Sequence, residues 1–282
     1  MDDKLLLRFY HLAYELSPRR GKRQQFSDTL IATLYQWSVQ CNKPMYWVCD
    51  PAHAPPFLRD RPLPSVSQFS RRVRGTGVQQ LRDAILLRLK PPPADTAVGC
   101  WMLDAKPLVI SPYSKDEQAK FGWAYNGLAR GYKVFALCDR DQHVLAWRVY
   151  AMNHAEPVAA KELMPAIDRP GYLLGDSIYD TNDLHQLAAE RGLQLVAPRK
   201  EPGGPIGERA RHPHRLHAID MLECHVNTFG PALYAWRTNI ERAFSRMTCS
   251  SVGMDHLPGW VRTLPRVQRW VQAKLTLYAM QN

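Results

Sequence analysis

The 282-residue sequence predicts an α/β protein in which a mixed sheet with flanking helices follows a small, mainly α-helical N-terminal domain. Apolar residues recur at helical spacing in the first ninety residues, with proline-rich segments between them. From residue 97 onward, short apolar runs come first and then alternate with amphipathic stretches, which is typical of one α/β domain. The stiff segment KPPPADT, residues 90–96, separates the two patterns. We therefore predict domains over 1–95 and 96–282.

The N-terminal domain contains a pair of helices with a basic first member. Ser65, with Gln68 three residues later, has the pattern of a capping box that begins a helix, and Gly75 ends this helix. A second helix is expected from Val78 to Leu89. The first helix carries three arginines: Arg71, Arg72 and Arg74. This arrangement fits a helix-turn-helix DNA-binding module and fits a helical hairpin with a solvated basic face equally well. Two further helices are expected upstream, over 3–16 and 27–40.

The second domain contains a regular series of elements. A polar turn separates two runs that form a hairpin, and Gly192 ends a capped helix. Strands are expected over 97–104, 131–139, 143–152, 171–176 and 193–198, and helices over 155–167, 181–192 and 232–247.

The amino-acid composition indicates which kind of partner the protein binds and in which cellular compartment it is expected. The formal net charge is +11, and residues 1–95 hold 15 Lys and Arg against 8 Asp and Glu. This basic front end suggests a polyanionic partner, most often nucleic acid. Six scattered cysteines without a CxxC pair are typical of reduced thiols in a cytosolic protein. No stretch of 18 uninterrupted apolar residues occurs, so a membrane span is not expected.

Two aspartates end predicted buried strands, where a charged carboxylate is costly unless a cation meets it. Asp104 ends the run AVGCWMLD, and Asp176 ends the run GYLLGD. If the two strands are neighbours, their carboxylates converge, and a divalent metal ion relieves the repulsion between them. With Glu241, from a helix farther along the chain, they form a set that can hold one or two Mg²⁺ ions. Two such ions activate an attacking oxygen and stabilise a leaving one on phosphate.

The helix that carries Glu241, ALYAWRTNIERAFSRM, has two distinct faces. Tyr234, Arg237 and Glu241 lie along one side at spacings of three and four residues. Taken alone, this side indicates a solvated face with an ion pair worth about 0.2–0.5 kcal/mol. The other side is an apolar stripe suited to a core: Leu233, Trp236, Ile240, Phe244 and Met247.

Several of these segments resemble the DDE transposases of bacterial insertion sequences, whose catalytic domain is ribonuclease-H-like. LDAKPL resembles the first-aspartate strand, GYLLGDSIYDTNDL the second-aspartate segment, and AWRTNIERAF the glutamate helix. GYKVFALCDRDQHVLAWRVYAMNHAE resembles the second and third strands of that domain. PSVSQFSRRVR resembles an N-terminal module often found ahead of it. The resemblance covers nearly the whole chain and is strongest from Cys100 to about Tyr278.

One subgroup of this family carries Tyr, two residues, Arg, three residues, Glu, six residues and Lys. Tyr234, Arg237 and Glu241 match this signature in register, whereas the lysine position is Thr248. In the family, that lysine contacts the transposon end, and here Arg246 is the nearby cation. The resemblance implies that Glu241 is the third metal ligand, that Arg237 touches phosphate and that Tyr234 stacks on or positions the DNA end.

The resemblance also implies an activity. Asp104, Asp176 and Glu241 would bind two Mg²⁺ ions, for which Mn²⁺ can substitute. The protein would hydrolyse the ends of an insertion sequence and transfer them into target DNA. A homodimer would pair the two terminal inverted repeats, in the bacterial cytoplasm at the nucleoid. Two other interpretations stay open: a metal-dependent nuclease of the same fold, and a non-catalytic or domesticated protein that binds terminal repeats.

Overall fold

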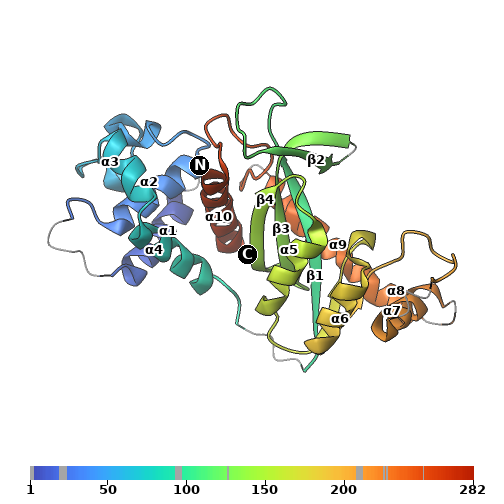
Figure 1. The fold of residues 1–282 in the computed structure, drawn as a ribbon. Coiled ribbons are helices and arrows are strands. Elements are labelled where there is room, and N and C mark those ends of the chain that lie inside the picture. Colours follow the sequence, from blue (N-terminus) through green and yellow to red (C-terminus); the bar gives the residue numbers. More distant parts are fainter. Residues whose placement is uncertain are drawn as a thin grey trace. The chain divides into compact units, whose positions relative to one another are not determined.

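A computed structural model gives the fold and describes residues 3–18, 24–92, 97–125, 127–207, 212–224, 226, 228–249 and 251–282 (Figure 1). By its internal contacts the chain divides into two compact units. Unit 1 comprises Met1–Lys90, Met247–Arg262 and Arg266–Asn282, and unit 2 comprises Pro91–Arg246 and Thr263–Pro265. Residues 93–96 of the predicted linker lie outside the described residues.

Unit 1 is helical, and the predicted helix starts at Ser27 and Ser65 are confirmed, whereas the helix expected from Val78 begins at Thr76. The side chain of Ser27 accepts a hydrogen bond from the amide of Leu30, and Ser65 and Gln68 form a reciprocal capping box. A short connection through Gly75 joins the two helices of the predicted pair. The helices are α1 (Asp3–Leu16), α2 (Asp28–Gln40), α3 (Val66–Val73), α4 (Thr76–Arg88) and α10 (Leu264–Gln281), with 3-10 turns η1 (Trp47–Cys49), η2 (Pro51–His53) and η3 (Pro56–Leu58).

Helix α10 packs with the N-terminal helices, whereas the sequence pattern placed it in a domain over 96–282. Gln36 on α2 donates a hydrogen bond of 3.0 Å to the carbonyl of Ala273 on α10. Lys274 is 2% exposed and donates to the carbonyls of Val39 and Val252, at 3.1 and 2.6 Å. Burial lowers the pKa of Lys274 to about 8. An apolar helix face in the sequence indicates that the helix packs on other elements, but it does not indicate which elements these are. The assignment of α10 to unit 1 therefore comes from the contacts in the structure.

Unit 2 contains a six-stranded mixed sheet. Strand β1 pairs antiparallel with β3 and parallel with β5, and β5 pairs parallel with β6. The long β3 pairs with β2 through its first residues and with β4 through the rest. The resulting order β4-β3-β1-β5-β6 is that of a ribonuclease-H-like sheet, so the predicted fold class is confirmed. The strands are β1 (Gly99–Val109), β2 (Lys120–Ala124), β3 (Gly127–Asp139), β4 (Val144–Ala151), β5 (Gly171–Leu174) and β6 (Leu193–Val196).

Helices α5 and α6 cover one face of this sheet (Figure 1). Trp101 and Leu103 of β1 belong to the core on that face, together with Leu173 of β5. Because side chains alternate along a strand, Asp104 points to the opposite face. The remaining elements of unit 2 are α5 (Glu156–Leu163), η4 (Met164–Ala166), η5 (Ser177–Tyr179), α6 (Asn182–Glu190), α7 (Pro213–Glu223), α8 (Phe229–Tyr234), η7 (Ala235–Arg237) and α9 (Thr238–Thr248).

Two predicted elements differ from the structure. Strand β1 does not end at Asp104 but continues to Val109, because β3 pairs with it from Trp101 onward along its whole remaining length. The predicted helix over 232–247 is divided into α8, the single 3-10 turn η7 and α9. Strand β2 was not predicted. Among the described residues, no helix is both long and apolar enough to cross a lipid bilayer.

Candidate active site

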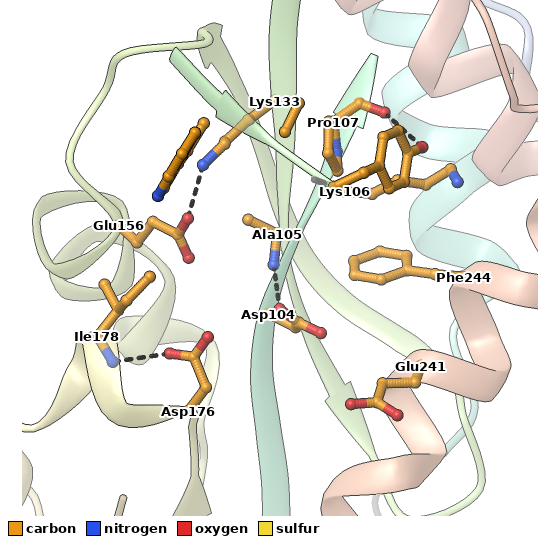
Figure 2. Close-up of a pocket in the computed structure, with 13 residues that line it drawn as sticks. Asp104, Ala105, Lys106, Pro107, Lys133, Glu156, Asp176, Ile178, Glu241 and Phe244 are labelled. Carbon is orange, nitrogen blue, oxygen red and sulfur yellow. Dashed lines mark hydrogen bonds and ion pairs between the residues drawn. The ribbon is translucent and has the colours of Figure 1, made fainter. Parts of the chain in front are cut away.

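The pairing of β1 with β5 brings the two predicted aspartates to the same end of the sheet. The paired residues run from Gly99 with Gly171 to Met102 with Leu174. Asp104 and Asp176 each come two residues after that last pair, Asp104 within β1 and Asp176 just after the end of β5. The carboxylate of Asp104 accepts a hydrogen bond of 2.8 Å from the amide of Ala105. That of Asp176 accepts one of 2.9 Å from the amide of Ile178 (Figure 2).

The helix that carries Glu241 is held against the turn between β3 and β4. Asn239, which is 4% exposed, donates a hydrogen bond of 2.9 Å to the carbonyl of Arg140. The Arg140 guanidinium lies 3.9 Å from the centre of the Trp236 ring. Trp236 was expected in the buried stripe but is 39% exposed, because it covers this arginine instead. Arg246, a predicted DNA contact, donates a hydrogen bond of 3.2 Å to the side chain of Gln142 in the same turn.

One pocket collects all three predicted carboxylates. Asp104, Asp176 and Glu241 line a cavity of about 420 Å³ (Figure 2). The other lining residues include two lysines and a fourth carboxylate, none of which the sequence analysis singled out. These are Lys106, Lys133 and Glu156, with Trp123 and Tyr125 among the apolar and aromatic neighbours.

The three carboxylates share a pocket without yet forming a coordination set. In the described part of the chain, one group of three or more His, Cys, Asp or Glu residues has its ligand atoms within 4.8 Å of one another, and this group lies outside the pocket. Between the carboxylates lies Arg237. Its Nη2 is 3.5 Å from Oδ2 of Asp104, and its Nη1 is 2.5 Å from Oε1 of Glu241. The predicted pair of Arg237 with Glu241 therefore exists and extends to the first aspartate.

Burial changes the acidity of the first aspartate. Desolvation raises the pKa of Asp104 to about 6, although the neighbouring Arg237 opposes the rise. The negative charges of Asp176 and Glu156 contribute to it as well. Part of the Asp104 carboxyl population is consequently protonated near neutral pH while no cation beyond Arg237 is present.

Tyr234, the first residue of the signature, contacts the second-aspartate segment. Its hydroxyl donates a hydrogen bond of 3.2 Å to the carbonyl of Gly175, the residue before Asp176. Desolvation is the main cause that raises the pKa of Tyr234, so the hydroxyl stays protonated and able to donate. The contact positions the Asp176 loop. The predicted DNA contact of Tyr234 stays a prediction.

Lys133 and Glu156 form a buried ion pair on the pocket wall, with Nζ and Oε1 2.8 Å apart (Figure 2). The hydroxyl of Tyr179 donates to the other carboxylate oxygen at 3.2 Å. A sequence signal for this pair exists, because a lysine inside the apolar run GYKVFALC must be paired when that run is a buried strand.

The group with close ligand atoms consists of Asp139, Asp141 and His143, in the turn between β3 and β4. One oxygen of Asp139 accepts hydrogen bonds from the amides of Asp141 and His143, both at 2.9 Å. The other oxygen lies 3.0 Å from Nδ1 of His143. These bonds close the turn, so local backbone geometry accounts for the cluster.

The predicted DNA-binding arginines of α3 and its end differ in their surroundings. Arg72 pairs with Asp28 at 2.5 Å and donates to the carbonyl of Phe26 at 2.8 Å, so it joins α3 to the start of α2. Arg74 is exposed and donates to the carbonyl of Ser70 at 3.0 Å. Arg71 is also exposed. Arg71 and Arg74 are thus the arginines of this helix that face solvent.

The chain is similar in sequence to a known family and weakly similar in fold to a solved structure. A solved cryo-EM structure of a piggyBac transposase synaptic complex with hairpin DNA aligns with 99% of this chain and 74% of that chain, at 10% identity and a TM-score of 0.45. No curated protein matches the sequence. The sequence model of the family described as Transposase DDE domain matches residues 100–280, well over half of the chain. It is this match that carries the assignment, and the protein belongs to the DDE transposase family.

Proposed function

We propose that the protein is the transposase of an insertion sequence and that Asp104, Asp176 and Glu241 are its catalytic carboxylates. The observation that carries the proposal is that three acidic residues far apart in the chain line one pocket. In this proposal they hold two Mg²⁺ ions, with Mn²⁺ as a substitute, because carboxylate oxygens are the donors these cations prefer. Glu241 is 53% exposed and has the side-chain freedom to turn toward the aspartates.

The division of roles follows from where each side chain lies. Bound divalent ions supply the charge that activates the attacking oxygen and stabilises the leaving oxygen of a phosphodiester. Asp104 and Asp176 give the site a rigid base, because β1 and the turn after β5 hold them. Arg237 and Lys106 bring positive charge to the same region and would orient the phosphate. The reaction would be hydrolysis at the element ends, followed by transfer of the 3′ ends into target DNA.

The rest of the chain fits a role in binding DNA. We assign terminal-repeat recognition to the predicted domain over 1–95, in which Arg71 and Arg74 are exposed. Arg246, at the end of α9, replaces the missing signature lysine as a cation near the DNA end. Because transposition joins two ends, we propose that the protein works as a homodimer on DNA.

The test uses oligonucleotides that carry the inverted repeats flanking the gene, both uncut and with a pre-cut 3′ end. Asp104→Asn, Asp176→Asn and Glu241→Gln should each abolish Mg²⁺-dependent cleavage and strand transfer while gel-shift binding to the repeat persists. Asp183→Asn is the matched control, because Asp183 is 80% exposed on α6 and lies outside the pocket lining.

Each other outcome identifies a competing function. Cleavage without transfer of the pre-cut end would indicate a nuclease of the same fold. Repeat binding by the wild-type protein without any cleavage would indicate a non-catalytic DNA-binding protein. If a carboxylate variant still cuts DNA at the wild-type rate, the substituted residue is not one of the catalytic carboxylates.

A further inference from the structure

A cation of the protein itself already lies between two of the proposed metal ligands. Arg237 reaches Asp104 at 3.5 Å and Glu241 at 2.5 Å. The side chains of Arg237 and Asp104 are only 17% and 16% exposed, so water and salt screen this pair weakly. Asp104 and Glu241 both project into the space between β1 and α9 (Figure 2). The guanidinium therefore neutralises the carboxylates that a divalent ion needs.

Few other contacts hold the Arg237 guanidinium in place. Its Nε is buried and has no hydrogen-bond partner among the residues that the structure describes. The structural arginines of unit 2 are bound differently. Arg215 uses both Nε and Nη2 on the carboxylate of Asp180, at 2.7 and 2.5 Å, and Arg199 forms the same two-pronged pair with Glu223. What holds the end of Arg237 is thus mainly its attraction to Asp104 and Glu241.

The backbone at Arg237 also departs from a regular helix. It is the last residue of η7, the 3-10 turn between α8 and α9. Short 3-10 segments within a helix often mark places where the helix adjusts its geometry. Arg237 therefore lies at an irregular point of the backbone, directly before α9 begins.

We propose that Arg237 is the resident counter-cation of the metal-free pocket and that a divalent ion displaces it from Asp104 and Glu241. The proposal rests on the proposed function, because it takes these two residues as metal ligands. Displacement releases the guanidinium toward a DNA phosphate. Binding of metal and binding of phosphate then reinforce each other, since linkage between two sites is reciprocal.

A purely structural role for Arg237 predicts the opposite effect on metal affinity. If the arginine only orders Glu241 for coordination, its removal weakens metal binding. If it competes with the ion, its removal strengthens metal binding, because two carboxylates lose their internal cation. The sign of the change therefore separates the two roles.

The experiment is a Mn²⁺ titration of the full-length protein without DNA, followed by the electron paramagnetic resonance signal of free Mn²⁺. Arg237→Gln should bind Mn²⁺ at least about fivefold more tightly than the wild-type protein. Arg237→Lys, which keeps the positive charge, should have a Mn²⁺ affinity closer to that of the wild-type protein. Unchanged or weaker binding by Arg237→Gln overturns the proposal.

Two further measurements complete the test. Arg246→Gln removes an exposed cation of the adjoining helix α9 and should change the Mn²⁺ affinity by less than about twofold, since exposed charges are screened. Equal tightening by Arg246→Gln overturns the proposal. Arg237→Met serves as a second neutral variant, and Mn²⁺ should raise its melting temperature more than that of the wild-type protein. An equal or smaller rise counts against displacement.

Failure of the proposed metal site gives a different result. Asp104→Asn should abolish the high-affinity Mn²⁺ site in the wild-type and Arg237→Gln backgrounds. If Mn²⁺ binding does not depend on Asp104, the catalytic assignment itself is wrong. If binding depends on Asp104 and Arg237→Gln does not tighten it, only the displacement is wrong.

Discussion

Lys133 and Glu156 form an ion pair of 2.8 Å with side chains only 9% and 11% exposed, on the wall of the acidic pocket. The pair joins β3 to the first turn of α5, and Tyr179 completes the hydrogen bonding of the carboxylate. Buried charges of this kind are tolerated only while both partners are present. The pair therefore fixes the base of α5 on the sheet and keeps a fourth carboxylate of the pocket neutralised.

Lys133→Met should destabilise the protein strongly, because it leaves Glu156 buried without its cation. The expected loss is about 3–5 kcal/mol in the free energy of unfolding, measured by urea denaturation. The double variant Lys133→Met with Glu156→Leu should recover most of this loss, since both charges are then absent. A single variant no less stable than the double would show that the pair is not coupled.

Asp104→Asn should make the metal-free protein more stable at neutral pH. The pKa of Asp104 is raised from 3.8 to about 6, so the folded state binds the proton more tightly than the unfolded chain. The stability associated with this group is fully present below pH 4 and is lost as pH rises through 6. About two pKa units correspond to roughly 3 kcal/mol at pH 8.

Denaturation curves of the wild-type protein and Asp104→Asn between pH 4 and 8 check this prediction. The two proteins should have similar stability near pH 4, and the variant should gain the advantage as pH rises. Under the proposed function, saturating Mn²⁺ should reverse the order, because the ion would stabilise only the protein that keeps the charged Asp104 carboxylate. If the difference in stability between the two proteins is largest at pH 4, the predicted direction of the pH dependence is wrong.

Asp180→Asn should be destabilising because Asp180, only 4% exposed, holds Arg215 and lies 3.1 Å from Nε2 of His185. Burial alone would raise the pKa of Asp180, but the hydrogen bonds from His185 and Arg215 lower it below its usual value. A lowered pKa contributes stability above the unfolded pKa, and this contribution is lost as pH falls through the folded value.

Asp180→Asn should therefore lower the free energy of unfolding by about 3 kcal/mol at pH 7. This loss should become smaller below pH 4. Urea denaturation at pH 7 and pH 3.5 measures it. Asp183→Asn, three residues later and exposed, is the control and should cost less than about 0.5 kcal/mol. An equal cost at both pH values would show that the charge of Asp180 is unimportant.

Asn239→Ala should lower the proposed cleavage activity without changing a proposed metal ligand. The buried amide fixes α9 to the carbonyl of Arg140, so its loss lets Glu241 move relative to the aspartates. We expect a fall of tenfold or more in cleavage rate, since displacements of about 1 Å at an active site carry such costs. Thr238→Ala, an exposed neighbour, should retain activity. Wild-type rates for Asn239→Ala would show that this anchor does not position Glu241.

Much of the fold follows from local patterns. The apolar runs around Trp101 and Leu173 predict strands, and the Ser65 capping box predicts the start of a helix, because these signals depend on neighbours in the chain. The spacing of Tyr234, Arg237 and Glu241 likewise places three polar side chains along one helical line. A signature that depends only on spacing can be recognised without coordinates.

Long-range packing decided the rest. The sheet order makes neighbours of Asp104 and Asp176, and no local pattern contains that order. Lys133 meets Glu156 only because β3 lies beneath α5, and α10 joins the N-terminal helices through hydrogen bonds to residues more than two hundred positions away. Arg237 contacts Asp104 as well as Glu241 for the same reason. The sequence alone determines the residue types and their spacing. Metal coordination and pKa values depend on distances between charged groups that are far apart in the chain, and only the folded sheet sets these distances.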